Sequence, residues 1–143
     1  MPLCLNQNPY LCIITTIIKN NTIIGNTAAN ILNGKSGNDT LYGGAGDDYL
    51  NGETGTNDWV DFSDIGTTSI NVNLRTGSAT GDGTDTLIAI ENIKASNGTN
   101  TLQGDSNSNS FVGGTGVDTI YGGSGDDTIF SSTGNDTIYG GDG

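Results

Sequence analysis

A nine-residue pattern recurs in two blocks of the sequence, and it restricts the chain to folds built from stacked copies of one small unit. Within the unit, glycines occupy places one, two and four, a carboxylate occupies place six and an apolar residue occupies place eight. Three copies follow the pattern closely, at residues 43–51, 113–121 and 122–130. Glycine permits tight turns, and the residues around place eight suit strands. Each unit is therefore predicted to be a turn followed by a short strand.

The spacing of nine is kept through two runs of units, from residue 16 to 60 and from residue 95 to 139. Helical periodicity is absent, and glycine at this density would cost a helix about 1 kcal/mol per residue. The sixth places are Asn21, Asn30, Asp39, Asp48 and Asn57 in the first run, and Asn100, Asn109, Asp118, Asp127 and Asp136 in the second. The eighth places are Ile23, Leu32, Leu41, Leu50 and Trp59, followed by Leu102, Phe111, Ile120, Ile129 and Ile138.

Consecutive units should run in opposite directions across a flattened coil, so that two successive units complete one turn of the coil. Strands one turn apart would then stack in parallel at roughly 4.8 Å. We predict an all-β fold, a right-handed parallel β-roll (a β-solenoid) of stacked 18-residue coils with an irregular middle segment. The composition agrees, because 32% apolar residues and 24 glycines suit a thin core more than a thick one.

One continuous domain is expected, divided into four segments: a lead or cap strand (1–15), a first repeat block (16–60), an irregular interlude (61–94) and a second repeat block (95–143). Within the interlude, residues 70–74 alternate as a half-buried strand does, and residues 81–87 are a degenerate repeat. Residues 86–94 keep the phase of the second block, with Glu91 at place six and Ile93 at place eight. The sequence stops inside a further unit, so we expect truncation at the C-terminal end. A flexible hinge between two separate rolls is the alternative.

The net charge is −12, from 16 acidic and 4 basic residues. Nucleic acid is excluded as a partner, because phosphate binding needs clustered Lys and Arg. No transmembrane stretch is present. The acids are mostly Asp at the repeat period, which indicates cation sites, and their repulsion should destabilise the fold until cations neutralise it. With no His and both Cys outside the repeats, a zinc or copper site is not expected.

Glycine-rich turns leave carbonyl oxygens uncovered, and Ca²⁺ takes six to eight oxygen ligands at about 2.3–2.6 Å. Two turns that lie one full coil apart could hold one ion between their sixth places. Asp118 with Asp136 ranks first, because this is the pair in the two runs with Asp at both sixth places. The mixed pairs are expected to bind weakly, or to stay empty with Asn side chains hydrogen-bonded along the stack. They are Asn109 with Asp127, Asn100 with Asp118, Asn30 with Asp48, Asn21 with Asp39, and Asp39 with Asn57. The glycines expected at these sites are Gly34, Gly37, Gly43, Gly44, Gly46, Gly113, Gly114, Gly116, Gly122, Gly123, Gly125 and Gly134.

These motifs resemble the repeats-in-toxin (RTX, hemolysin-type) family, whose nonapeptide Gly-Gly-x-Gly-x-Asp-x-apolar-x forms a calcium-filled parallel β-roll. Units 34–42 and 131–139 depart from it at one or two glycines, and the remaining units carry Asn for Asp. The resemblance covers roughly residues 25–143. It implies several bound Ca²⁺ ions, type I secretion from a bacterium, and folding on calcium outside the cell. It also implies covalent neighbour domains in a larger secreted toxin, protease, lipase or adhesin.

Intrinsic enzymatic activity is not expected, because the chain has no His and no nucleophile motif. It would then be the non-catalytic accessory module of a secreted protein such as an enzyme. A metal-free β-solenoid with Asn ladders and a disordered calcium-free chain are further alternatives. An ice-binding or surface-binding solenoid with rows of Thr and Asn is another, which thermal hysteresis would reveal.

Overall fold

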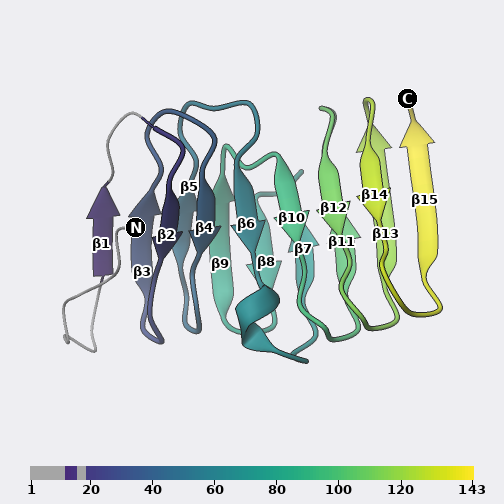
Figure 1. Ribbon diagram of the computed structural model, residues 1–143, viewed down its shortest axis with the longest axis horizontal. Helices are drawn as coiled ribbons and strands as arrows, with labels where there is room; N and C mark the ends of the chain where they lie inside the picture. Colours follow the sequence, from purple (N-terminus) through teal and green to yellow (C-terminus); the bar gives the residue numbers. More distant parts are fainter. Residues whose placement is uncertain (1–11, 16–18) are drawn as a thin grey trace.

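The computed structural model describes residues 12–15 and 19–143, which form two sheets of short strands (Figure 1). The rest of the predicted lead segment, and residues 16–18 of the first predicted unit, lie outside the described residues. In the described part, the larger sheet has nine strands in the order β1 (Cys12–Thr15), β3 (Asn30–Asn33), β5 (Tyr49–Asn51), β9 (Thr84–Ile88), β8 (Ser78–Thr80), β7 (Asn71–Asn73), β11 (Thr101–Gln103), β13 (Thr119–Ser124) and β15 (Thr137–Asp142). The smaller sheet has six, in the order β14 (Thr128–Phe130), β12 (Ser110–Val112), β10 (Asn92–Lys94), β6 (Trp59–Asp61), β4 (Thr40–Tyr42) and β2 (Thr22–Ile24).

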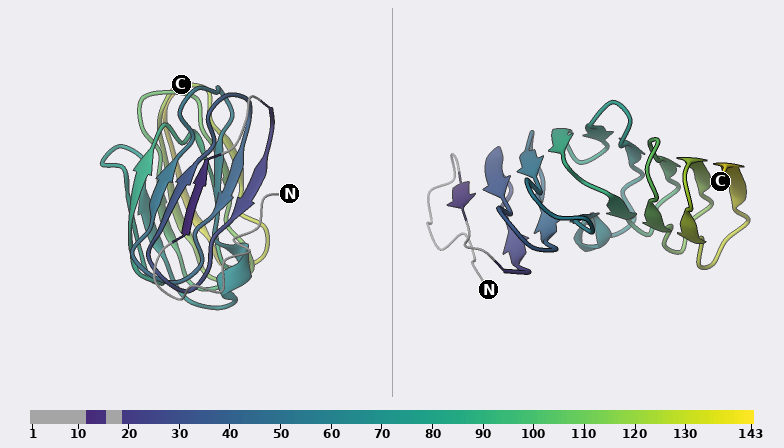
Figure 2. Two further views of the ribbon diagram at one scale, coloured as in Figure 1. Left: turned by 90° about the vertical axis from the view of Figure 1, so that its left-hand side faces the viewer. Right: turned by 90° about the horizontal axis from the view of Figure 1, so that it is seen from above.

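In both repeat blocks the chain alternates between the sheets, one strand at a time. Strands on the same side pair in parallel with their equivalents one coil later, so that Thr22 lies beside Thr40 and Thr119 beside Thr137. The two layers are visible when the molecule is viewed along the stack (Figure 2, left). The predicted all-β parallel solenoid, in which two successive units form one coil, is therefore confirmed.

The core is a double row of eighth-place side chains between the sheets. Because successive side chains in a strand point to opposite faces, one residue per short strand faces inward. Leu41, Leu50 and Phe111 are 0% exposed, as are Ile23, Leu32, Leu102 and Ile120. The row becomes exposed at its far end, where Ile138 of β15 is 47% exposed. The predicted core positions are thus correct in most units.

The last unit of the first block differs from the prediction by one residue. Val60, and not Trp59, occupies the core place: Val60 is 0% exposed and pairs with Leu41, whereas Trp59 pairs with Thr40 on the outer face. The extra residue is accommodated in the turn of residues 52–58. A one-residue slip moves every side chain of a strand to the opposite face, so Trp59 in the narrow interior would have exposed Val60.

The interlude doubles back on itself. After β6 the chain passes through a short 3-10 helix, η1 (Ser63–Ile65), to β7, which lies beside β11. It then returns through β8, which is antiparallel to both β7 and β9, and β9 pairs in parallel with β5. On the other side β6 pairs directly with β10. The predicted strand at residues 70–74 is β7, and Ile93 is buried as predicted.

An ion pair between a buried Asp61 and a 41% exposed Lys94 joins β6 to β10 where the two blocks meet. Asp61 is 4% exposed, and the ammonium of Lys94, its partner across the sheet, lies 3.0 Å from its carboxylate. Burial alone would raise the pKa of Asp61, but hydrogen bonds from Ser63, Tyr42 and Lys94 outweigh it and lower the pKa below its ordinary value.

Among the described residues, no helix has the length and apolar character needed to cross a membrane.

Candidate metal centre

The glycine-rich turns stack along the two edges of the solenoid, each against its equivalent in the next coil. The first edge carries turns 34–39, 52–58, 89–91, 104–109 and 122–127, and the second carries turns 25–30, 43–48, 81–85, 95–100, 113–118 and 131–136. Backbone hydrogen bonds hold neighbouring turns in register, for example from Gly34 N to Asn51 O at 2.9 Å and from Gly113 N to Phe130 O at 2.9 Å. Residues far apart in sequence thereby face one another at fixed intervals.

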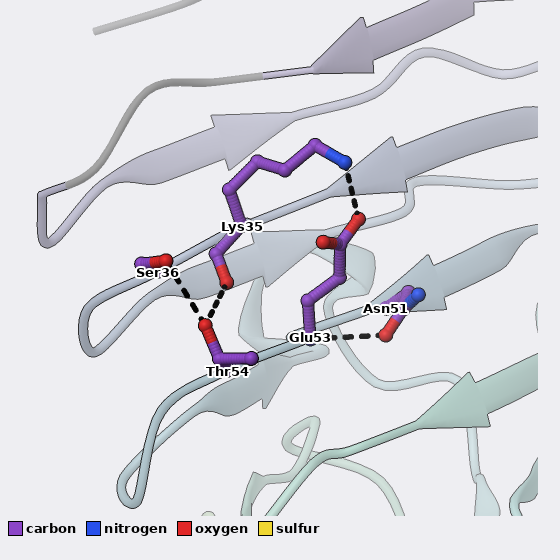
Figure 3. Close-up of polar contacts among 5 residues, drawn as sticks. All are labelled: Lys35, Ser36, Asn51, Glu53 and Thr54. Carbon is purple, nitrogen blue, oxygen red and sulfur yellow. Dashed lines mark hydrogen bonds and ion pairs between the residues drawn. The ribbon is translucent and has the colours of Figure 1, made fainter.

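Second-place residues show how tightly adjacent turns are matched (Figure 3). Gly44 at this place has φ 86°, and Lys35 and Glu53 adopt similar values, 79° and 65°, although the left-handed region disfavours side chains. Lys35 Nζ lies 2.7 Å from Glu53 Oε1, and the Thr54 hydroxyl donates to Lys35 O at 2.9 Å. Such exposed ion pairs contribute about 0–1 kcal/mol, so they align the turns more than they stabilise them.

The sixth-place aspartates reach back to the preceding coil on their edge. One carboxylate oxygen accepts from the backbone N–H of the earlier sixth place, for example from Asn100 to Asp118 Oδ1 at 2.9 Å and from Asp118 to Asp136 Oδ1 at 3.0 Å. The same bond joins Asn21 to Asp39, Asn30 to Asp48 and Asn109 to Asp127 at 2.7, 2.8 and 2.8 Å. The structure therefore brings these predicted pairs together.

Asn57 is not at the sixth place, as a consequence of the longer turn. It is exposed, and its amide oxygen accepts from Asn92 Nδ2 at 2.7 Å. Asp58 occupies the sixth place instead, and its Oδ1 accepts from Asp39 N at 2.6 Å. The sequence contains a signal that the spacing obscured, because Asn57-Asp58 repeats the dipeptide Asn-Asp that ends the turns at Asp39 and Asp136.

The interlude supplies a further sixth-place carboxylate. Asp85 is 4% exposed, and its Oδ1 accepts from Asp48 N at 3.0 Å, although 37 residues separate the two. Asp118 with Asp136 is therefore one of several places where carboxylates meet, together with Asp39–Asp58 and Asp48–Asp85. The ranking of Asp118 with Asp136 above the other pairs stays a prediction, because the spacing of nine did not place Asp58 or Asp85 beside another carboxylate.

The second oxygens of these carboxylates define the site. In the part of the chain that the structure describes, five buried side-chain oxygens accept no hydrogen bond, and all five are sixth-place Oδ2 atoms: Asp39, Asp48, Asp58, Asp118 and Asp127. A buried polar group without a partner costs roughly 1–3 kcal/mol, and more when it is charged. Their recurrence at one place of the repeat indicates a ligand that supplies positive charge.

Each unpartnered oxygen lies beside a first-place glycine. A Cβ on Gly34 would lie 2.3 Å from Asp39 Oδ2 and 3.0 Å from Gly52 O. A Cβ on Gly113 would lie 2.7 Å from Asp118 Oδ2 and 2.8 Å from the carbonyl oxygen of Ser131. Glycine thus leaves uncovered a place where a carboxylate oxygen and a carbonyl oxygen of the next turn converge. Convergent oxygens without a donor fit a hard cation such as Ca²⁺.

Turns with Asn at the sixth place hydrogen-bond both side-chain atoms without a metal. The amide oxygen of Asn30, which lies beside the first-place Gly25, accepts from Asn26 N at 2.7 Å. Asn100 Nδ2 donates to the carbonyls of Ser96, Gly98 and Gly113, each at 3.0 Å. Asn30 Nδ2 donates to Ala28 O and, at 3.0 Å, to Asn26 Oδ1. The amide group therefore binds these carbonyls in the role that a cation would have. The turns fall into two classes: aspartate turns with an unpartnered carboxylate oxygen, and asparagine turns whose side chains are hydrogen-bonded within the protein.

Several of these carboxyl groups have raised pKa values, so they ionise less readily than a free Asp when no cation is bound. Burial, opposed by a backbone hydrogen bond from Asn30 and reinforced by Asp85, raises the pKa of Asp48 to about 7. Burial also raises the pKa of Asp58 and of Asp85 to about 6. A divalent cation would reverse this preference by stabilising the charged form.

Within residues 12–15 and 19–143, no group of three or more His, Cys, Asp or Glu side chains is placed to hold a metal. The donor set is instead one carboxylate oxygen with backbone carbonyls, which is compatible with Ca²⁺.

The model of the RTX calcium-binding nonapeptide repeat (4 copies) matches residues 24–58, 94–129 and 121–143, more than half of the chain. No curated protein matches the sequence. The chain therefore belongs to the RTX family of calcium-binding nonapeptide repeats and is a calcium-binding β-roll.

Proposed function

We propose that this protein is a secreted bacterial module that folds when calcium fills its aspartate turns. The observation that carries the proposal is the set of five buried, unpartnered Oδ2 atoms at one place of the repeat. We assign the ions to the turns of Asp39, Asp48, Asp58, Asp118 and Asp127, with first-place carbonyls of neighbouring turns as further ligands. The asparagine turns of Asn30, Asn100 and Asn109 carry no ion in this proposal.

Charge makes folding dependent on the ion. The net charge of −12 opposes compaction, and the buried Asp oxygens add a desolvation cost in each turn. An ion that binds the folded chain alone stabilises it by about 1.4 kcal/mol per site at ten times its Kd. Because stacked turns share ligands, several sites act together, and the transition with calcium concentration should be steep.

Calcium-dependent folding would serve the secretion of the protein. The RTX family is typical of secreted bacterial proteins, and a chain that stays extended at low cytosolic calcium would fold where calcium is plentiful. The module is then non-catalytic, and its role is to fold a larger secreted protein, such as a toxin, protease, lipase or adhesin, outside the cell. That parent protein would contain the catalytic or adhesive domain.

A titration followed by circular dichroism tests the proposal. Adding Ca²⁺ to chelator-treated protein should convert a coil spectrum into a β spectrum, and Mg²⁺ at the same concentration should not, because Mg²⁺ requires a strict octahedron and retains its waters. Isothermal titration of the same samples counts the ions. A full β spectrum in chelator, unchanged by calcium, would contradict folding on the ion.

A further inference from the structure

The outer face of the smaller sheet has a shallow hollow where the two repeat blocks meet. It lies across β4, β6, β10 and β12, which are neighbours in that sheet (Figure 1). The hollow has a volume of about 310 Å³, and its lining residues are Thr40, Tyr42, Trp59, Asp61, Lys94 and Val112. This volume lies at the lower limit of small-molecule sites, roughly 300–1,000 Å³. All six residues lie in strands, so the hollow is separate from the glycine-rich turns that bear the unpartnered oxygens.

Strand register places an aromatic pair beside polar groups in this hollow. Residues that flank an inward-facing residue of a strand point to the outer face. Trp59 therefore lies on the outer face beside Thr40, its cross-strand partner. One place away from the core residue on the other side, Tyr42 hydrogen-bonds to Asp61, and Asp61 pairs with Lys94. An indole, a phenol and two charged groups from three strands thus share one small area.

The polar groups are held in place by the buried carboxylate. Asp61 accepts from Ser63 N at 2.8 Å, and Lys94 Nζ lies 3.0 Å from its other oxygen. Burial and the hydrogen bond to Asp61 raise the pKa of Tyr42 to about 12, so the phenol stays protonated and donates to that carboxylate. Lys94 is 41% exposed, and an ammonium has three donors, so it retains donors for a ligand.

The charges of the hollow favour a neutral ligand. The carboxylate of Asp61 and the ammonium of Lys94 balance each other, whereas the whole chain has a net charge of −12. An anionic ligand would be repelled by the protein and would find its one cation already paired. A cationic ligand would have to displace Lys94 from a buried carboxylate. A neutral ligand with an apolar face and hydroxyl groups at its edge matches an indole bordered by hydrogen-bonding groups.

We propose that this hollow binds a neutral pyranose unit of a glycan, with the C–H face of the sugar on the indole of Trp59 and its hydroxyls hydrogen-bonded to Lys94 and Thr40. This inference goes beyond the proposed function, because the site uses the outer face of a sheet and none of the aspartate turns. Calcium is needed only for the folded state. The module would then attach its parent protein to a carbohydrate surface as well as fold outside the cell.

The experiment uses the full chain in saturating Ca²⁺ and its single tryptophan, Trp59, as the reporter. The probes are two neutral glucose oligosaccharides, cellohexaose and maltohexaose, and one anionic oligosaccharide, hexagalacturonate. We expect a saturable change of tryptophan emission with at least one neutral probe and none with the anionic one. Isothermal titration gives the Kd, which Trp59→Thr should raise by about tenfold or more, because the aromatic surface is lost.

Two controls separate the site from loss of the fold and from general aromatic adhesion. Thr22 and Thr40 occupy the equivalent place in β2 and β4, so Trp59→Thr is compatible with the sheet, and circular dichroism in Ca²⁺ checks this. Tyr139, which is 53% exposed and stacks on Tyr121, lies on the outer face of the larger sheet, so Tyr139→Thr should keep the wild-type Kd.

No saturable response to either neutral probe would overturn the proposal, as would binding of the anionic probe alone or equal losses in the two variants. A chain that is fully β in chelator would contradict folding on calcium, and the same sugar titration would still decide whether the hollow binds a glycan.

Discussion

A single atom separates the two classes of turn in this protein. At the sixth place Asn supplies an N–H₂ group that donates to surrounding carbonyls, as Asn100 does, whereas Asp supplies a second oxygen that finds no donor. Buried polar groups are stable when they are paired, so the asparagine turns are complete as they stand, and we propose that a cation pairs the open oxygens of the aspartate turns. In this proposal the departures from the repeat motif decide which turns depend on metal.

The raised pKa values predict opposite pH dependences with and without calcium. The pKa of Asp48 is raised to about 7 and those of Asp58 and Asp85 to about 6, so the calcium-free folded chain binds more protons than the unfolded chain. Its stability should therefore be greatest below about pH 4 and be lost as the pH rises through about 6 to 7. In saturating Ca²⁺ the dependence should reverse, because protons compete with the ion for the same oxygens.

Urea midpoints between about pH 5 and pH 8, measured in chelator and in Ca²⁺, check this sign. If the chelated chain is too unfolded for a midpoint, its β signal by circular dichroism should increase on acidification. Asp48→Asn should flatten both profiles. Parallel pH profiles in chelator and calcium would contradict the prediction.

At the scale of the turn-and-strand unit, the first-place glycine is required for space and not for backbone conformation. Gly113 is not among the residues with positive φ, yet a Cβ there would lie 2.7 Å from Asp118 Oδ2 and 2.8 Å from Ser131 O. The unit therefore keeps glycine where the next turn and the carboxylate approach the backbone. The strand half of the unit has a separate constraint, since its single inward residue fills the core.

Gly113→Ala should weaken calcium binding and destabilise the folded protein by about 1–3 kcal/mol, the usual cost of overpacking. Gly140→Ala is the matched control: it occupies the same place of a later unit, its φ is not positive, and a Cβ there would have no neighbour within 4 Å. Thermal unfolding and calcium titration of both variants provide the comparison. Equal effects at the two glycines would show that backbone propensity, and not the space between the oxygens, determines the requirement.

At the scale of the whole molecule, the interlude doubles back within the larger sheet. The two sheets therefore differ in their number of strands, but each runs without a break from the first repeat block to the second. The larger sheet inserts β9, β8 and β7 between the blocks, opposite the single junction of β6 with β10 (Figure 2, right). The ion pair between Asp61 and Lys94, 3.0 Å long, lies at that junction. One block therefore docks on the other through strand pairing on both sides, and calcium should compact the chain as a unit.

Small-angle scattering should show this compaction. Scaling laws give a radius of gyration of about 39 Å for an unfolded chain of this length and about 14 Å for a compact globule. We expect a value close to the unfolded limit in chelator, and in calcium one nearer to the globule and somewhat larger because the stack is elongated. A mixture of one folded and one extended block at intermediate calcium would contradict docking as a unit.

The nine-residue period was sufficient to predict the turns, the strands, the parallel stacking and most of the core. These features depend on short-range chemistry: glycine permits the turn, alternation sets which face of a strand is buried, and identical units stack most simply in register. Leu41 and Phe111 could therefore be assigned to the interior, and Asp39 and Asp118 to the turns, without coordinates.

The position of Asp58 and the return path through β8 could not be predicted in this way. An extra residue in a turn is nearly neutral locally, and its place is decided when Val60 packs against Leu41 of the preceding coil. Contacts such as Asp48 with Asp85 span 37 residues and exist only because the chain doubles back. The conformational preferences of the residues recur with the nine-residue period, so they predict the regular units. Where the period is interrupted, long-range packing determines the path of the chain.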